Sequence, residues 1–162
     1  MTSGMTSLSR ARLIAILVPN ALLWGAIGSQ YLGHLVPCEM CMWQRWPHLA
    51  AIGLALVAIG LRRNPSASRG LTALAAVAIL ISGAIGAFHA GVEYHWWKGL
   101  SACSAPVLNG TGDILAQIMA APVIRCDVAQ WTLFGISLAG WNALVSLVAG
   151  VAILRLITRT VR

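Results

Sequence analysis

Four long apolar stretches constrain the fold of this chain more than any other feature of its sequence. They cover about residues 13–33, 43–61, 71–91 and 133–154. Each has roughly the 20 residues that an α-helix needs to cross a hydrocarbon layer about 30 Å thick. Only 9% of the 162 residues are charged, whereas soluble domains carry about 25%. We therefore expect an all-α membrane protein, a single domain over residues 1–162 that forms a four-helix transmembrane bundle.

The first apolar stretch could instead be a secretory signal peptide. Arg10 and Arg12 precede it, and Ala26-Ile27-Gly28 resembles a cleavage site. However, the apolar core of a signal peptide usually has about 7–15 residues, which is shorter than this stretch, and three further spans follow it here. We therefore interpret it as the first span.

The connections between the spans differ in charge. Both ends of the chain and the turn after the second span carry arginine and no acidic residue. These arginines are Arg10, Arg12, Arg62, Arg63, Arg69, Arg155, Arg159 and Arg162. Because cytoplasmic loops hold an excess of Lys and Arg, we expect both termini in the cytoplasm and the loops 34–42 and 92–132 outside it. The net charge of +7 therefore reflects topology and not nucleic-acid binding, since the basic residues form no patch interleaved with aromatics.

The connection 92–132 is the long hydrophilic loop of the chain. Within it, residues 113–120 place apolar side chains at helical spacing: Ile114, Leu115, Ile118 and Met119. This pattern predicts a short amphipathic helix that lies on the bilayer surface.

Four cysteines lie in these two outer loops. Cys38 and Cys41 form a Cys-x-x-Cys pair just before the second span, and Cys103 and Cys126 lie in the longer loop. Two thiols at the Cys-x-x-Cys spacing are typical of a redox pair or of a metal site. At the start of a helix, free N–H groups and the helix dipole favour a thiolate, and Arg45 lies one turn after Cys41. The pattern predicts a reactive thiolate at the membrane surface.

Two other uses of the cysteines have to be considered. A Cys₄ zinc site usually has two Cys-x-x-Cys knuckles, and Cys103 and Cys126 do not form one. An oxidising compartment also disfavours a thiolate cage, so we expect no metal. Structural disulfides are the second alternative, but a ring as small as Cys38–Cys41 would stabilise the fold little.

The chain resembles the DsbB family, the bacterial inner-membrane disulfide oxidases that reoxidise the periplasmic dithiol oxidase DsbA. The resemblance covers nearly all four spans and both outer loops. The residues that carry it are Gln30, the run Pro37-Cys38-x-x-Cys41-x-x-x-Arg45, His89, Cys103 and the run Cys126-Asp127-x-x-Gln130-Trp131-x-x-Phe134-Gly135-Ile136-Ser137.

This resemblance implies a relay of electrons through the cysteines. Cys103 is attacked by the partner's thiolate, and Cys126 is its disulfide mate. Electrons then pass through a transient Cys38–Cys103 disulfide to the Cys38–Cys41 pair. Cys41 as a thiolate donates to a quinone, and Arg45 stabilises the charge that develops there.

The resemblance also implies the surroundings of the protein. Gln30 and His89 would line the quinone pocket together with Cys41 and Arg45. The cofactor would be ubiquinone or menaquinone, drawn from the quinone pool of the respiratory chain in the lipid. The protein partner would be a periplasmic thioredoxin-like protein of the DsbA type. Both termini would be cytoplasmic and all cysteines periplasmic, in the bacterial inner membrane.

Two functions remain as alternatives to a disulfide oxidase. An oxidoreductase resembling vitamin K epoxide reductase shares the four-helix, four-cysteine layout, but its active Cys-x-x-Cys comes late in the chain, whereas here it comes first. A non-enzymatic membrane subunit stapled by disulfides is the other alternative. It would not consume quinone when supplied with a reduced thioredoxin-like partner.

Overall fold

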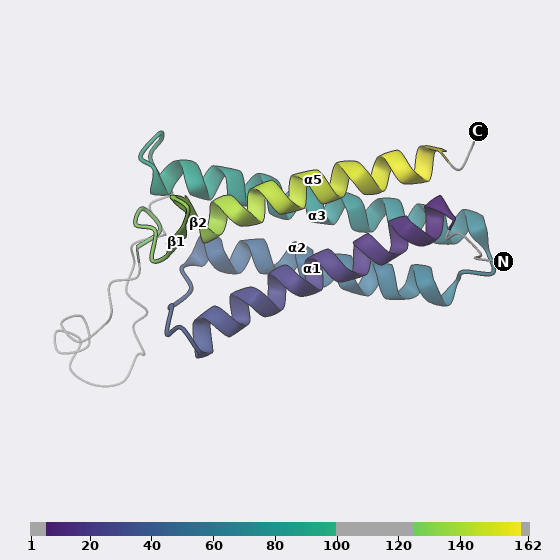
Figure 1. Cartoon of the computed structure of the whole chain (residues 1–162), viewed down its shortest axis with the longest axis horizontal. Coiled ribbons are helices and arrows are strands. Elements are labelled where there is room, and N and C mark those ends of the chain that lie inside the picture. Colours follow the sequence, from purple (N-terminus) through teal and green to yellow (C-terminus); the bar gives the residue numbers. More distant parts are fainter. Residues whose placement is uncertain (1–5, 100–124, 160–162) are drawn as a thin grey trace, which may run out of the picture.

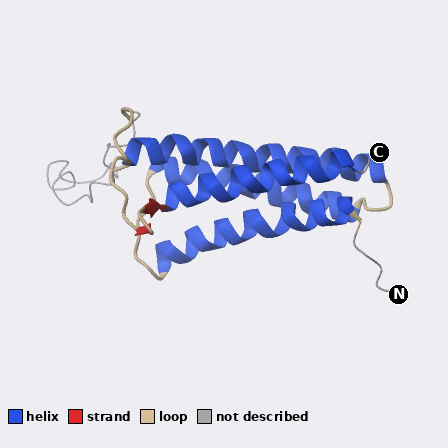
Figure 2. Ribbon diagram, turned by 45° about the horizontal axis from the view of Figure 1, so that its top comes forward, coloured by secondary structure: helices blue, strands red, loops and turns tan. Residues whose placement is uncertain are grey.

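The structure, a computed structural model, describes residues 6–99 and 125–159. In these ranges four long helices lie side by side as a bundle (Figures 1 and 2). They are α1 (Ser7–Tyr31), α2 (Glu39–Gly60), α3 (Pro65–Glu93) and α5 (Leu138–Arg159). α3 packs mainly against α2 and α5, and α1 packs against the same two helices. The all-helical fold expected from the sequence is confirmed.

Three of these helices, α1, α3 and α5, are long and apolar enough to cross a membrane. α2 is as long as α5, but its first half contains Gln44, Arg45 and His48, which make it more polar. The structure therefore supports a membrane protein with three candidate spans in its described part. The fourth span at 43–61 stays a prediction, and the predicted helix at 113–120 lies outside the described residues.

Capping side chains start the first three helices. Thr6 Oγ1 accepts a hydrogen bond from the Ser9 amide at 3.2 Å, and Asn64 Oδ1 accepts one from the Ala67 amide at 3.2 Å. Such caps satisfy N–H groups that have no partner within the helix. At α2 the cap is Cys38, whose Sγ accepts from the Cys41 amide at 3.3 Å. The Cys-x-x-Cys pair thus forms the first turn of a helix, as the sequence predicts.

A small β-hairpin precedes α5, so this helix begins later than the predicted span start at residue 133. Its strands are β1 (Thr132–Leu133) and β2 (Ile136–Ser137), paired antiparallel. Phe134 and Gly135 form the turn with φ of 53° and 76°, the left-handed values that two-residue hairpin turns require. The Tyr94 hydroxyl donates to the Gly135 carbonyl and accepts from the Ser137 amide, both at 3.0 Å. The hairpin is therefore fixed to the end of α3.

Small residues let α3 and α5 approach closely. A Cβ added at Gly86 would lie 2.9 Å from Asn142 Nδ2 and 3.0 Å from the Ala139 carbonyl oxygen. A Cβ at Gly83 would lie 3.0 Å from the Ser146 Cβ. Contacts this short leave no room for a larger side chain, so glycine at these positions is what brings Asn142 against α3.

The two ends of the bundle differ in composition. The start of α1, the turn between α2 and α3, and the end of α5 lie together at one end (Figure 1). The segments there carry Arg10, Arg12, Arg62, Arg63, Arg69, Arg155 and Arg159. The loop with Cys38 and Cys41 and the hairpin lie at the opposite end. These seven arginines and the Cys38–Cys41 pair are therefore separated by the length of the helices.

Candidate active site

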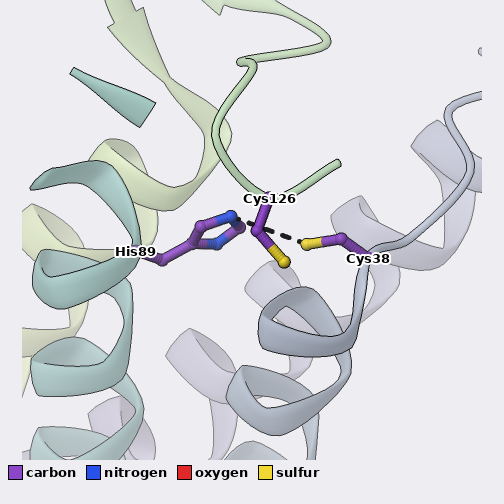
Figure 3. Close-up of side chains that lie close together, drawn as sticks. All are labelled: Cys38, His89 and Cys126. Carbon is purple, nitrogen blue, oxygen red and sulfur yellow. Dashed lines mark hydrogen bonds between the residues drawn. The ribbon is translucent and has the colours of Figure 1, made fainter. Parts of the chain in front are cut away.

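Three of the four cysteines lie in the described residues, and they meet at the hairpin end of the bundle. Cys38 Sγ is 2.9 Å from Cys41 Sγ, and all three thiols are free. The Sγ atoms of Cys38 and Cys126 and a ring nitrogen of His89 all lie within 4.8 Å of one another (Figure 3). Cysteines from the two outer loops therefore share one buried site. Cys103 lies outside the described residues, so its bonds to Cys126 and Cys38 stay predictions.

A hydrogen bond between the loops supports this arrangement. Gln130 Nε2 donates to the Val36 carbonyl at 2.6 Å, which joins the segment after Cys126 to the segment before Cys38. Both Cys38 and Cys126 are almost fully buried, with 3% and 2% of their surface exposed. Contact between the two loops thus holds these sulfur atoms together and excludes most of the solvent.

The same cluster offers metal-ligating atoms. Two thiolates and an imidazole, from Cys38, Cys126 and His89, are donors of the kind that Zn²⁺ uses. Cys38 is also a member of the Cys-x-x-Cys pair, so a metal here and a Cys38–Cys41 disulfide would exclude each other. Any such metal would be limited to the reduced protein.

The two thiols of the pair, in the loop 34–42 outside the predicted spans, differ in acidity. The hydrogen bond from Cys38 Sγ lowers the pKa of the Cys41 thiol, although burial opposes the shift. The same contact, together with burial, raises the pKa of the Cys38 thiol. Of the two thiols, Cys41 is therefore the more acidic one, and Cys38 is the one held in the protonated form. The reactive thiolate at Cys41 stays a prediction, and the direction of its pKa shift supports it.

Arg45 lies one turn after Cys41 and is held by α1. Its Nη1 donates to Gln30 Oε1 at 2.8 Å, and its Nη2 donates to the Ala26 carbonyl at 3.2 Å. Gln30 therefore positions the guanidinium group and does not itself line the cavity described below. The Nε of Arg45 is buried and has no hydrogen-bond partner among the described residues.

A cavity of about 1020 Å³, counting the space at its open mouth, lies beside the cysteines. Helices α1 and α5 supply mainly apolar side chains to its wall, including Leu22, Ala26, Leu138, Ala139 and Trp141. The polar side of the wall contains Cys38, Cys41, Gln44, Arg45, His48, His89 and Glu93. Predominantly apolar walls with a few convergent polar groups are typical of small-molecule sites.

Three polar atoms on this wall have no protein partner in the described part of the chain. They are Arg45 Nε, His48 Nδ1 and Glu93 Oε2, and all three are buried. A buried polar atom without a partner costs about 1–3 kcal/mol, so most such atoms are paired in folded proteins. Three of them on one cavity wall indicate that the cavity binds a polar ligand group.

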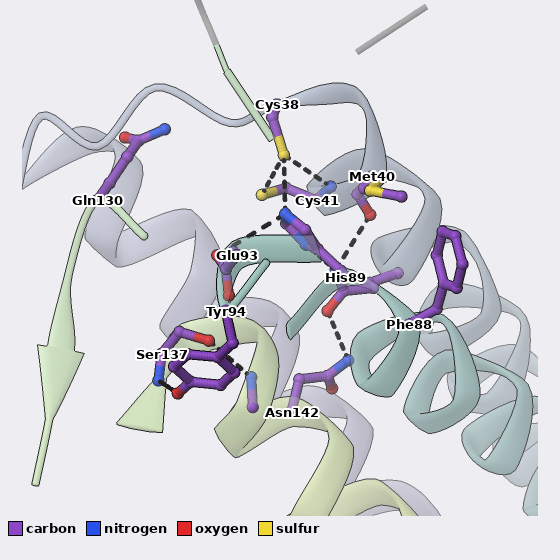
Figure 4. Close-up of polar contacts among 12 residues, drawn as sticks. Cys38, Met40, Cys41, Phe88, His89, Glu93, Tyr94, Gln130, Ser137 and Asn142 are labelled. Atoms are coloured by element: carbon purple, nitrogen blue, oxygen red, sulfur yellow. Dashed lines mark hydrogen bonds and ion pairs between the residues drawn. The ribbon is translucent and has the colours of Figure 1, made fainter. Parts of the chain in front are cut away.

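His89 connects the cysteines to the interior of the bundle. Its Nδ1 accepts from Gln44 Nε2 at 2.9 Å, so in the neutral ring Nε2 carries the hydrogen. Nε2 lies 3.5 Å from Cys38 Sγ and 3.7 Å from Glu93 Oε1 (Figure 4). His89 therefore presents an N–H group to the sulfur of Cys38, and its Nε2 is closer to this sulfur than to Glu93.

Sequence reasoning missed a buried polar network behind His89. Neither His48 nor Asn142 stands out in the sequence as a candidate site residue, yet Asn142 joins Gln44 at 2.8 Å and His48 at 2.8 Å. A signal was present in the sequence, because positions 41, 45 and 48 fall on one face of a helix. Cys41, Arg45 and His48 therefore mark a polar stripe on an otherwise apolar span.

Comparison with known proteins gives one consistent family. The family model of DsbB, described as disulfide bond formation protein DsbB, matches residues 9–156. The disulfide bond formation protein B of Verminephrobacter eiseniae is 34% identical over 149 residues, which cover 88% of this chain and 81% of that protein. The protein of the same name from Polaromonas naphthalenivorans is 30% identical over 161 residues, 93% of each chain. No solved structure matches this chain significantly.

Proposed function

This chain belongs to the DsbB family of disulfide bond formation proteins and is a disulfide oxidoreductase; we propose that it reoxidises a periplasmic DsbA-type protein and passes the electrons to membrane quinone. The observation that carries the proposal is the position of the Cys38–Cys41 pair. It lies on the wall of the cavity, with Cys126 of the second loop beside it. The Cys38–Cys41 pair can therefore exchange disulfides with Cys126 and also transfer electrons to a small molecule bound in the cavity.

The sulfur exchange follows from the positions of these cysteines. When the partner's thiolate attacks Cys103 of a Cys103–Cys126 disulfide, the thiolate of Cys126 is released. That thiolate attacks Cys38 of the Cys38–Cys41 disulfide, forms a Cys38–Cys126 bond and releases Cys41 as a thiolate. The partner's second thiol then attacks the mixed disulfide, which forms the partner's disulfide and releases the Cys103 thiolate. Attack of Cys103 on Cys126 restores the Cys103–Cys126 disulfide and leaves Cys38 and Cys41 reduced. A leaving thiol with a low pKa leaves faster, which suits Cys41.

This exchange assigns the interloop bond to Cys126. The resemblance implies a Cys38–Cys103 bond at that step, which stays a prediction. We favour Cys126, because its sulfur lies within 4.8 Å of Cys38 Sγ in the described residues.

The potentials support a carrier other than a thiol. A DsbA-type oxidant has a reduction potential of about −120 mV, and other redox dithiols lie at about −270 to −180 mV. Each 30 mV against the flow costs about 1.4 kcal/mol for two electrons. A common dithiol couple therefore cannot recharge such a partner, and a stronger acceptor is required.

The cavity residues fit a quinone as that acceptor. A bound quinone supplies the capacity to take up two electrons and two protons. The apolar wall from α1 and α5 suits its ring, and the unpaired Nε–H of Arg45 suits an oxygen atom of the ring. Cys41 faces this space as a thiolate, Arg45 stabilises negative charge there, and His89 directs its Nε2–H at Cys38.

The membrane topology completes the proposal. Four spans in the bacterial inner membrane, both termini cytoplasmic and the cysteine loops periplasmic, are supported by the gathering of arginines at one end of the bundle. Reporters fused after Arg63 and after Arg162 should report the cytoplasm, and a reporter fused after Gly110 should report the periplasm. A periplasmic C-terminus would contradict this topology.

Quinone consumption tests the proposed function. The purified protein, supplied with a reduced DsbA-type partner, should reduce ubiquinone or menaquinone and form one disulfide for each quinol. Absence of consumption with either quinone would favour the disulfide-stapled subunit. Consumption with a small dithiol but not with the partner protein would favour the activity that resembles vitamin K epoxide reductase.

A further inference from the structure

We propose that His48 is a second polar contact of the quinone site, where its Nδ1 accepts a hydrogen bond from a hydroxyl group of the quinol. The site would then hold the reduced carrier more tightly than a site without this acceptor. The inference rests on the proposed function and extends it to a residue that the relay of cysteines does not use.

His48 has the properties of a ligand-binding side chain. It is 3% exposed, lines the cavity and follows Cys41 on the same face of α2. Its Nε2 has two hydrogen-bond partners, whereas its Nδ1 is buried without one in the described part of the chain. One ring nitrogen is therefore fixed by the protein, and the other is left for a ligand.

The hydrogen-bond network determines which atoms donate. The Met40 carbonyl can only accept, so the side-chain nitrogen of Gln44 must face it, at 3.1 Å. Gln44 Oε1 then accepts from Asn142 Nδ2 at 2.8 Å, and Asn142 Nδ2 also lies 3.2 Å from the Ser82 carbonyl oxygen. Two backbone carbonyls thus orient both amides, and Asn142 Oδ1 is the atom that faces His48.

This orientation fixes the tautomer of His48. Its Nε2 lies 2.8 Å from Asn142 Oδ1 and 2.9 Å from Ser82 Oγ. The Ser82 hydroxyl donates its own hydrogen to the Gln44 carbonyl at 2.8 Å, so both neighbours of Nε2 accept. Nε2 therefore carries the hydrogen, and in the neutral ring Nδ1 is an acceptor.

An acceptor at this position distinguishes the two forms of the carrier. A quinone carbonyl oxygen has no hydrogen to donate, whereas a quinol hydroxyl has one. The charged side chain of α2 closest in sequence to His48 is Arg45, one turn earlier, and its positive charge favours the neutral form of the His48 ring. The carboxylate on the cavity wall belongs to Glu93, which lies beside His89. The contact therefore forms with the product of the reaction, in which Cys38 and Cys41 become a disulfide and the carrier takes up two electrons and two protons.

Two substitutions separate the ring nitrogens of His48. The amide of His48→Gln reaches the position of Nε2 and keeps the contact with Asn142, but it leaves nothing at Nδ1. The amide of His48→Asn reaches the position of Nδ1 and loses the contact with Asn142. The full-length protein in detergent is titrated without turnover: a short-chain ubiquinol into the reduced protein, and the matching ubiquinone into the oxidised protein. Thermal melting is recorded for each variant.

We expect His48→Gln to weaken quinol binding by about threefold to tenfold, the loss of one neutral hydrogen bond, and to leave quinone binding and the melting temperature unchanged. His48→Asn should keep the quinol affinity and lower the melting temperature. A tenfold loss for quinol alone corresponds to about 30 mV in the potential of the bound carrier.

Other outcomes would overturn the inference. Unchanged quinol binding in His48→Gln would show that His48 has only a structural role. An equal loss of affinity for quinone and quinol would show that the ring shapes the cavity without forming the proposed hydrogen bond. A lowered quinol affinity in His48→Asn, which keeps an acceptor at the position of Nδ1, would also overturn the inference. Failure of the wild type to bind either carrier would instead overturn the proposed function.

Discussion

Replacement of Cys41 by serine should stop quinone reduction while partner capture by the second loop continues. Cys41 is the thiol of its pair with the lowered pKa and lines the cavity, and a serine hydroxyl is neither ionised nor able to form a disulfide. Cys103 belongs to the long hydrophilic connection in the sequence, and we expect a soluble protein to reach it. Trapping with a partner that lacks its resolving cysteine should give a gel-shifted complex with Cys41→Ser, while quinone absorbance stays constant.

The matched control is Cys103→Ser, which should fail in the opposite way. It should give no trapped complex, and its Cys38–Cys41 pair, once reduced by a small dithiol, should still reduce quinone. Both variants remove one sulfur atom. A difference between them in partner trapping or quinone reduction is therefore due to the position of the cysteine and not to the loss of a thiol as such. If Cys38 captured the partner in Cys103→Ser, the proposed order of the relay would be wrong.

Arg45→Ala should slow quinone reduction by about tenfold to a hundredfold and leave every disulfide in place. The estimate corresponds to the loss of one charge-assisted hydrogen bond, about 1.5–3 kcal/mol. The guanidinium group lies one turn from the Cys41 thiolate, on the cavity wall, and its Nε is unpaired within the described residues. The measurement is the turnover number with saturating quinone, together with a count of free thiols.

Gln30→Ala is a control for the positioning of Arg45. It removes the 2.8 Å contact to Nη1 and keeps the positive charge and the contact to the Ala26 carbonyl, so a smaller loss of rate is expected. The turnover number of Arg45→Lys should lie between those of Arg45→Ala and Gln30→Ala, because lysine keeps the positive charge but lacks the planar guanidinium group. A normal turnover number for Arg45→Ala would reduce Arg45 to an anchor at the membrane interface.

The sequence was sufficient for features that depend on neighbours along the chain. Apolar runs of helical length predicted the helices, and the spacing of Cys38, Cys41 and Arg45 predicted a thiolate at the start of α2. These features depend on one helix at a time. The cap by the Cys38 sulfur and the lowered pKa of Cys41 agree with them.

Features that depend on packing between segments could not be predicted in the same way. Asn142 reaches Gln44 and His48 because Gly86 lets α5 approach α3, and no periodicity within one helix encodes that pair. In the sequence, a polar residue within an apolar span that hydrogen-bonds another helix cannot be distinguished from one that binds a ligand. The hairpin before α5 was also missed, because its strands have only two residues each and its turn requires positive φ at Phe134 as well as at a glycine.

The attachment of the hairpin end to the rest of the protein limits how far Cys126 can travel. Gln130 is bonded to the Val36 carbonyl, and Tyr94 holds the hairpin that follows. The four residues from Cys126 to Gln130 can reach roughly 14 Å even when fully extended. A tether this short gives Cys126 a high effective concentration at Cys38, so exchange between these two sulfurs is an intramolecular event. The rate of the exchange between Cys126 and Cys38 is then independent of the concentration of the soluble partner. That concentration limits only the first step, in which the partner meets the second loop.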